Sequence, residues 1–175
     1  LDTIRAGVLD GLKAEGFEEG KNLTVDFQSA QGSTANAAQI AKKFAGANPD
    51  AIIAITTPSA QAVAAATKNI PLIYTAVTDP VGAKLVPSLE PSHTNITGVS
   101  DELPVGPQID LMKKLVPNLK TIGYVYSPGE VNSTTVLERL KAKAAEQNIE
   151  VAAAPAQRSA DVLTAARSLG GKADV

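Results

Sequence analysis

Cysteine and tryptophan are absent from the 175-residue chain, and histidine occurs once, at His93. Without cysteine the chain forms no disulfide and offers no thiolate to a metal. A single histidine provides no histidine pair for a metal site, and no nucleophile-elbow sequence lies near it to support a hydrolytic triad. The composition therefore argues against metal and triad chemistry, and no cofactor is expected.

Long apolar runs and a strong charge of either sign are also missing. No run approaches the roughly 18 apolar residues that a membrane-spanning helix needs. The 16 basic and 18 acidic residues give a net charge of −2, without the basic surplus of a nucleic-acid-binding domain. What is present is 44% apolar residues with only three Tyr and three Phe. A core of Ala, Val, Ile and Leu is typical of helices packed on a parallel sheet.

Helical and strand patterns alternate along the chain. Residues 51–55 are a continuous apolar run, as in a parallel strand covered on both faces. Strands separated by helices predict βαβ units in a doubly wound parallel sheet. The expected order is helix 2–14, strand 22–29, helix 34–46, strand 51–55, helix 57–69, strand 71–77, short helix 81–86, strand 95–100, helix 104–116, strand 121–126, helix 133–147, strand 149–153 and helix 159–169.

The two ends of the chain indicate an incomplete α/β fold. The first element is a helix, whereas a central strand usually precedes it in a doubly wound sheet, and residues 172–175 resemble the approach to a further buried strand. We therefore expect an N-terminal lobe at 1–103 without its first strand, and the start of a second lobe at 104–175. Such a chain would expose strand edges and apolar helix faces.

Polar residues follow the predicted strands at the edge where open α/β sheets bind ligands. Thr57, Ser59 and Ala60 begin a helix whose free N–H groups suit a carboxylate. Thr78 and Asp79 follow strand 71–77, where the Asp79 carboxylate suits an ammonium group. The alternative interpretations are structural: Thr57 caps its helix, and Asp79 forms a turn before proline.

The loop after strand 121–126 is a third candidate. It contains Ser127, Glu130, Asn132 and Ser133, and it leads into the predicted helix 133–147. Asn132 or Ser133 is expected to cap that helix, and Glu130 adds a negative charge. An ordinary polar loop with a helix cap remains the alternative.

Seven short motifs together resemble one family over the whole chain. They are Leu1–Gly7, Glu19–Asn22, Ala30–Gly32, Thr56–Gln61, Val77–Val81, Thr97–Asp101 and Ser127–Ser133. The family is that of the ABC-transporter substrate-binding proteins, which includes the tryptophan-binding TrpX proteins. The resemblance implies a type I periplasmic-binding-protein fold, with two Rossmann-like lobes and a ligand cleft between them.

The resemblance also implies a function without catalysis. Members bind a small molecule, here an amino acid with an aromatic side chain such as tryptophan, and deliver it to a membrane permease. They are extracytoplasmic, in the periplasm or at the cell surface as lipoproteins, and no signal sequence is visible in this chain. Ser100 and Asp101 join the expected ligand-binding residues because they lie in a matching motif near the lobe crossover, and Tyr74 or Tyr126 is a candidate to line the side-chain pocket.

Two alternatives belong to other classes of protein. The same fold serves as the ligand-sensing core of transcription regulators, which predicts a helix-turn-helix segment upstream of Leu1. An enzyme on a doubly wound sheet would act through carboxylates such as Asp79 and Asp101.

Overall fold

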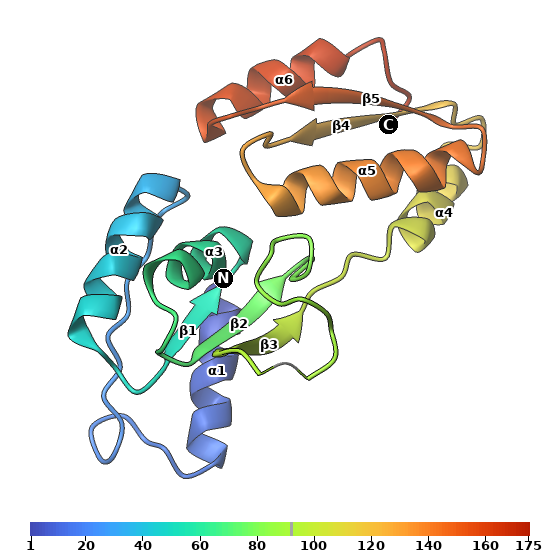
Figure 1. Ribbon diagram of the computed structural model, residues 1–175. Helices are drawn as coiled ribbons and strands as arrows, with labels where there is room; N and C mark the ends of the chain where they lie inside the picture. Colours follow the sequence, from blue (N-terminus) through green and yellow to red (C-terminus); the bar gives the residue numbers. More distant parts are fainter. Residues whose placement is uncertain (92) are drawn as a thin grey trace. The chain divides into compact units, whose positions relative to one another are not determined.

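The chain consists of two compact units, Leu1–Asp101 (unit 1) and Glu102–Val175 (unit 2). The computed structural model describes residues 1–91 and 93–175 (Figure 1). The division falls two residues before the lobe boundary suggested by the sequence.

Unit 1 is built on a three-stranded parallel sheet with the order β1-β2-β3. Its strands are β1 (Ile52–Ile55), β2 (Leu72–Val77) and β3 (Ile96–Ser100). Parallel pairing brings the carboxyl ends of all three strands to one edge of the sheet, where loops lead toward the following elements. The apolar run of β2 is deeply buried, with Leu72 1% exposed and Val77 fully covered.

Three helices accompany this sheet: α1 (Asp2–Ala14), α2 (Thr34–Ala47) and α3 (Thr57–Ala66). α3 packs against β1 and β2, and α2 packs on α3 (Figure 1). Ser33 caps α2, because its Oγ accepts the Asn36 N–H at 3.2 Å. α1 is amphipathic in sequence but contains no fully buried residue.

The predicted strand at 22–29 is wrong. Leu23 forms only an isolated bridge with Glu19, and residues 24–30 have no regular structure. Alternating apolar residues favour an extended chain, but a strand also needs a neighbour to accept its hydrogen bonds. The segment is held by side chains instead: the Arg5 guanidinium lies 4.5 Å from the Phe27 ring centre, and Lys43 pairs with Asp26 at 3.1 Å.

The short helix predicted at 81–86 is a single turn. Lys84 has a left-handed φ of 58°, and the N–H of Leu85 donates to the carbonyl of Pro80 at 2.9 Å. This pattern satisfies the carbonyls of a helix end and stops propagation after one turn.

Unit 2 is a parallel two-stranded sheet with helices on both faces (Figure 1). In chain order its elements are α4 (Val105–Leu115), β4 (Thr121–Tyr126), α5 (Val131–Ala145), β5 (Glu150–Pro155), the 3₁₀ turn η1 (Ser159–Asp161) and α6 (Val162–Leu169). The α/β class and the parallel sheets predicted from the sequence are confirmed.

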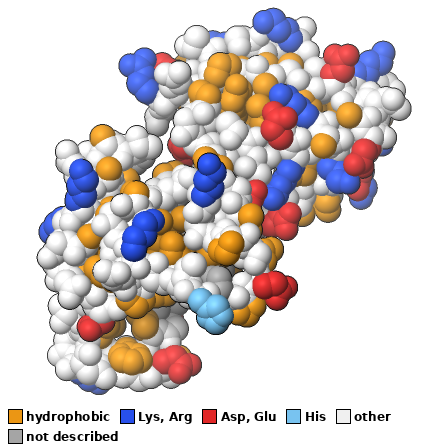
Figure 2. Space-filling model, in the orientation of Figure 1, with side chains coloured by type: hydrophobic (Ala, Val, Ile, Leu, Met, Phe, Trp, Pro, Cys, Tyr) orange, Lys and Arg blue, Asp and Glu red, His pale blue; other side chains and the backbone are white. Residues whose placement is uncertain are grey.

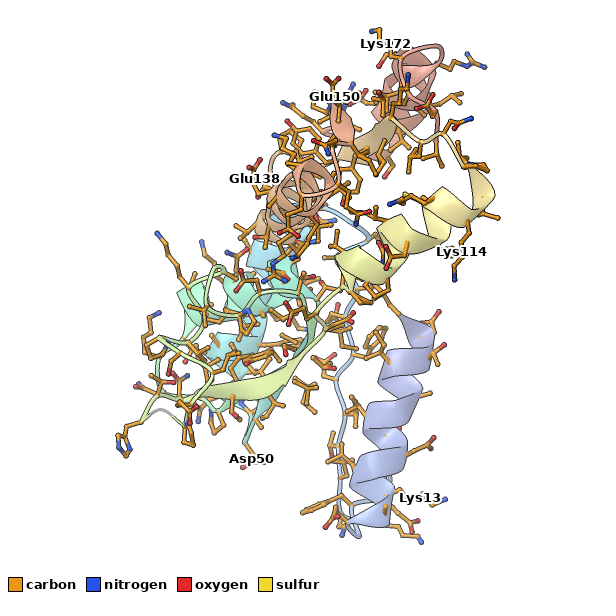
Figure 3. All side chains as sticks on the ribbon, turned by 90° about the vertical axis from the view of Figure 1, so that its right-hand side faces the viewer. Lys13, Asp50, Lys114, Glu138, Glu150 and Lys172 are labelled. Atoms are coloured by element: carbon orange, nitrogen blue, oxygen red, sulfur yellow. The ribbon has the colours of Figure 1, made fainter. Side chains whose placement is uncertain are left out.

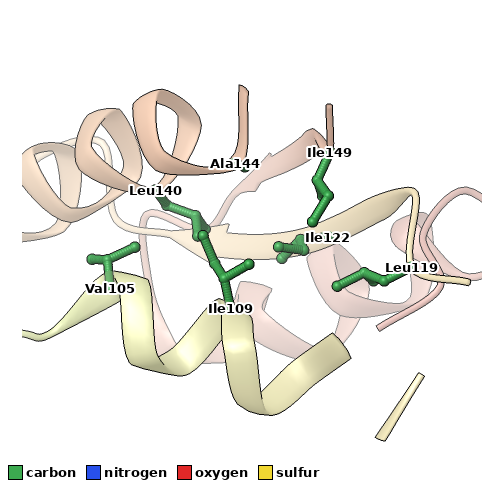
Figure 4. Packing of buried hydrophobic residues seen from close by; sticks show 7 residues of the cluster. All are labelled: Val105, Ile109, Leu119, Ile122, Leu140, Ala144 and Ile149. Carbon is green, nitrogen blue, oxygen red and sulfur yellow. The ribbon is translucent and has the colours of Figure 1, made fainter. Parts of the chain in front are cut away.

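Each face of the unit 2 sheet has its own apolar cluster. On one face, α4 and α5 meet β4 around Ile109, which is fully buried, and Ile122 and Leu140 pack with it (Figure 4). On the other face, Ala154 of β5 packs with Ala165 of α6. Small residues let α6 approach the sheet closely, whereas the first cluster is filled by branched side chains.

The molecular surface carries both charges and uncovered apolar side chains. Acidic and basic groups are interspersed on the face shown in Figure 2, and Lys13 and Lys114 lie on the outer sides of their helices (Figure 3). Leu111 and Leu115 of α4 are 57% and 73% exposed. In the part of the chain that the structure describes, every helix is too short or too polar to cross a membrane.

The last residues of the chain pair with the free edge of β4. The N–H of Asp174 donates to the Thr121 carbonyl at 2.9 Å, and the Asp174 Oδ2 accepts the N–H groups of Lys120 and Thr121 at 2.8 and 2.9 Å. These two backbone hydrogen bonds, first from Lys120 and then from Thr121, lower the pKa of the Asp174 carboxyl below its ordinary value near 3.8.

We expect Asp174→Ala to lower the melting temperature at neutral pH, because the start of β4 loses an acceptor for two N–H groups. The Asp174 carboxyl has a lower pKa in the folded state than in the unfolded state. The stabilisation is therefore present at pH values above the pKa of the unfolded state, and it is lost as the pH falls through the pKa of the folded state. The melting temperatures of variant and unaltered protein should therefore draw together as the pH falls below the ordinary carboxyl pKa of 3.8, and meet only below the lowered pKa of the folded state. Asp110→Ala, on the exposed surface of α4, is the control, and a gap that persists in acid would contradict the assignment.

Candidate functional site

The carboxyl end of β1 leads directly into α3. The helix begins at Thr57, so Thr56 occupies the cap position, and its side chain makes no capping hydrogen bond. The prediction that Thr57 itself caps the helix is therefore wrong by one residue. Thr57 is 2% exposed, and its Oγ1 is buried without a hydrogen-bond partner in the chain. Ala60 is fully buried one turn on, and its N–H donates to the Thr56 carbonyl at 3.0 Å.

Thr56 has a strained backbone. Its φ of 85° and ψ of 156° fall in a region that glycine occupies almost alone, and a β-branched residue there is a true outlier. Such a conformation costs about 1–3 kcal/mol and persists only where the surroundings enforce it. Here the Thr56 N–H donates to the Thr75 carbonyl of β2 at 2.9 Å, and its Oγ1 lies 3.4 Å from Ser59 Oγ.

The carboxyl end of β2 leads into a turn closed by Asp79. Both Thr78 and Asp79 are half-buried. The Asp79 Oδ1 accepts the Gly82 N–H at 2.8 Å, which is the turn-forming role considered as the alternative. A Cβ on Gly82 would lie only 2.5 Å from Asp79 Oδ2, so a side chain at position 82 would displace the carboxylate.

The carboxyl end of β3 completes the same edge. Ser100 and Asp101 are exposed, and the Asp101 N–H donates to the Val77 carbonyl at 2.8 Å. Unit 1 therefore brings together seven of the residues selected from the sequence at the carboxyl edge of one sheet. These residues, called the unit 1 edge below, are Thr57, Ser59, Ala60, Thr78, Asp79, Ser100 and Asp101.

Unit 2 presents a comparable edge after β4. The Ser127 N–H donates to Ser133 Oγ at 2.9 Å, so the hydroxyl joins the two ends of the loop. α5 begins at Val131, with Glu130 in the cap position and no side-chain cap. The expectation that Asn132 or Ser133 caps α5 is therefore wrong, because the helix starts earlier and Ser133 Oγ accepts from the strand side.

Asn132 lies in the first turn of α5, and its Oδ1 is buried without a hydrogen-bond partner in the chain. Within the residues that the structure describes, only Thr57 Oγ1 and Asn132 Oδ1 are buried side-chain polar atoms in this condition. Leaving such a group unpaired costs about 1–3 kcal/mol, so each is a candidate contact for a polar ligand. Ser127, Glu130, Asn132 and Ser133 form the unit 2 edge.

The two candidate tyrosines differ in position. Tyr126 is the last residue of β4 and is half-buried beside Ser127. Tyr74 lies in the middle of β2, where burial raises the pKa of its phenol. It lines a hollow of about 530 Å³ together with Pro71, Leu89 and Ile96, and none of the unit 1 edge residues lines that hollow. Among the described residues no cluster of His, Cys, Asp and Glu is suited to hold a metal ion.

Comparison with known proteins shows the family to which the chain belongs. Residues 1–175 match the family described as ABC transporter substrate binding protein, and the chain belongs to it. A tyrosine-binding protein of Clostridioides difficile is 43% identical over 175 residues, which are 100% of this chain and 51% of that protein. The chain therefore spans about half the length of this relative.

Solved structures agree with this membership. A conserved domain protein of Vibrio cholerae has a TM-score of 0.97 at 52% identity, covering 99% of this chain and 58% of that one. The ABC domain of Streptococcus pneumoniae in complex with L-Trp has a TM-score of 0.94 at 37% identity, with 99% and 58% coverage. The family and the type I fold class predicted from the sequence are confirmed.

Proposed function

We propose that this chain provides ligand-binding surface to an extracytoplasmic solute-binding protein of an ABC importer. The bound solute is an amino acid with an aromatic side chain, and the protein passes it unchanged to a membrane permease. Membership in the family supports the transport role, and the relatives that bind tyrosine or L-Trp support the class of solute. No chemistry on the solute is proposed.

One observation carries the proposal: in the part of the chain that the structure describes, the two buried side-chain polar atoms without a partner both belong to residues of the predicted edges. Thr57 Oγ1 lies at the start of α3 and Asn132 Oδ1 at the start of α5. The free N–H groups of a helix start favour an anionic ligand, so the start of α3 suits the carboxylate of an amino acid. In unit 2, Asn132 Oδ1 is a hydrogen-bond acceptor, and each unit by itself offers a carboxylate, Asp79 or Glu130, that suits an ammonium group.

Isothermal titration of the full-length protein with the twenty common amino acids tests the function itself. We expect heat with at least one of L-tyrosine, L-tryptophan and L-phenylalanine, and none with acidic or basic amino acids. Absence of heat with all three aromatic amino acids would remove the assignment.

Thr57→Val tests the role of the buried hydroxyl, since it keeps the shape of the side chain and removes only the polar atom. We expect the affinity for the aromatic amino acid to fall about tenfold, the loss of one hydrogen bond of about 1.4 kcal/mol. The melting temperature should hold or rise, because an unpaired buried hydroxyl is removed.

The matched control for this variant is Thr34→Val, which makes the same change at the exposed first residue of α2. It should leave the affinity unchanged. If Thr57→Val binds as well as the unaltered protein, the hydroxyl does not contact the ligand.

A further inference from the structure

β2 carries one residue more than β3 between two of their paired positions. Tyr74 pairs with Gly98 and Val77 with Ser100, so three steps along β2 match two along β3. Ala76 accommodates the extra residue by adopting a left-handed φ of 54°. This arrangement is a β-bulge, a feature that redirects the residues following it and is common beside functional sites.

The extra residue reverses the alternation of side chains along β2. In a regular strand Val77 would share a face with Ile73 and Thr75, which are half-buried. Instead Val77 is fully covered, like Leu72 and Tyr74, which are 1% and 5% exposed. Val77 is therefore as buried as Leu72 and Tyr74, which lie on the other face in a regular strand. The in-and-out alternation of side chains is thus shifted by one residue at the end of β2.

Two residues of the unit 1 edge, Thr78 and Asp79, follow the bulge directly. The Val77 carbonyl accepts the Asp101 N–H at 2.8 Å, and two residues later Asp79 Oδ1 accepts the Gly82 N–H at 2.8 Å. The bulge thus precedes Thr78 and Asp79 directly. The bulge therefore sets the direction in which the chain leaves β2 toward these two residues.

A second left-handed residue supports the bulge from the neighbouring strand. Thr56 donates its N–H to the carbonyl of Thr75, the residue immediately before Ala76. Thr56 and Ala76, two non-glycine residues with positive φ, therefore lie near each other where β1 and β2 end, because the hydrogen bond from Thr56 ends on the residue that precedes Ala76. Glycine would adopt either conformation at no steric cost, so the strain is maintained by the structure around the edge.

We propose that Ala76 is a positioning residue for ligand binding: its left-handed backbone sets the direction in which the chain leaves β2, and with it the positions of Thr78 and Asp79 at the unit 1 edge. The inference rests on the proposed binding of an amino acid there. Ala76 acts through its backbone, so the property that matters is the ability of the residue to adopt positive φ. A β-branched residue cannot do so without strain, whereas glycine can.

The test compares Ala76→Val with Ala76→Gly in the full-length protein, with L-tyrosine and L-tryptophan as titrants. All variants are titrated at a temperature at which circular dichroism shows them fully folded. We expect Ala76→Val to weaken binding by about tenfold or more, and Ala76→Gly to stay within about threefold of the unaltered protein. Ala51→Val, at an exposed residue just before β1, is the matched control and should bind normally.

A second measurement needs no ligand. The amide protons of Gly82 and Asp101 report on the turn and on the β2–β3 pairing after the bulge. Their hydrogen exchange, measured by NMR, should accelerate in Ala76→Val and stay slow in Ala76→Gly.

The outcomes separate this inference from the proposed function. If the unaltered protein binds neither of these two amino acids nor L-phenylalanine, the proposed function fails, while the exchange data still decide whether Ala76 sets the conformation of the edge. A folded Ala76→Val protein with normal affinity, or with unchanged exchange at both amides, overturns the positioning role. Equal loss of affinity in the glycine and valine variants also overturns it, because the side chain would then matter instead of the backbone.

Discussion

Gly98→Ala is expected to destabilise the sheet of unit 1 by about 3 kcal/mol, near the upper end of the usual cost of overpacking. A Cβ at position 98 would lie 2.1 Å from the Tyr74 carbonyl oxygen and 2.6 Å from atoms of the Tyr74 ring. The carbonyl belongs to the paired strand β2 and cannot rotate away as a flexible side chain could. Relief of the clash requires β2 and β3 to separate, and that separation removes ladder hydrogen bonds.

Amide hydrogen exchange read by mass spectrometry is suited to this prediction because it resolves the two units. Peptides from β2 and β3 should exchange faster in Gly98→Ala, whereas those from β4 and β5 should not change. Gly46→Ala is the control: it lies in α2 with open space around its added Cβ, and it should stabilise the helix by about 0.5–1 kcal/mol. Normal protection of β2 and β3 in Gly98→Ala would show that the strands can absorb a methyl group.

Ile109→Ala is expected to cost unit 2 about 3 kcal/mol, within the range for large-to-small changes in a core. Ile109 is fully buried at the centre of the cluster formed by α4, α5 and β4 (Figure 4). Ile122 and Leu140 pack in the same cluster, so removal of three carbon atoms leaves a cavity that neighbours on separate elements fill poorly.

The matched control for Ile109→Ala lies on the same helix. Leu115 is 73% exposed, so Leu115→Ala should change the stability by no more than about 0.5 kcal/mol. Urea unfolding followed by circular dichroism, with exchange in β4 and β5 as the local readout, measures both variants. Equal effects of the two substitutions would mean that the face of α4 carrying Ile109 does not form the core of unit 2.

The strand and helix patterns predicted most elements because buried runs and helix boundaries depend on residues that are close together in the sequence. The strand at 121–126 and the helix at 2–14 have the predicted bounds, since each has a clear apolar period and a stop at Gly16 or a loop at Ser127. The failure at 22–29 has a different origin. A strand depends on a neighbouring strand for its hydrogen bonds, and that dependence is not visible in the period of its own residues.

The candidate site was predictable in its location but not in its detailed geometry. Placement after parallel strands indicated that Thr57 and Asp79 would share an edge, as they do in unit 1, whereas Ser100 was selected from a family motif. The positive φ of Thr56 was not predicted, because nothing in a threonine signals positive φ; a glycine there would have been a clear signal. The importance of Gly82 was missed as well. It depends on the short distance between Gly82 and the Asp79 carboxylate, which only the tertiary structure shows.

By itself the sequence determined the α/β class, the order of most elements and the edge at which polar residues gather. Each of these follows from local period, turn residues and the direction of parallel strands. Only the tertiary structure decided that Ala76 is left-handed, that Thr57 and Asn132 carry buried atoms without partners, and that 24–30 is not a strand. Register and hydrogen-bond pairing depend on which backbone lies alongside, and a linear pattern of residues does not contain that information.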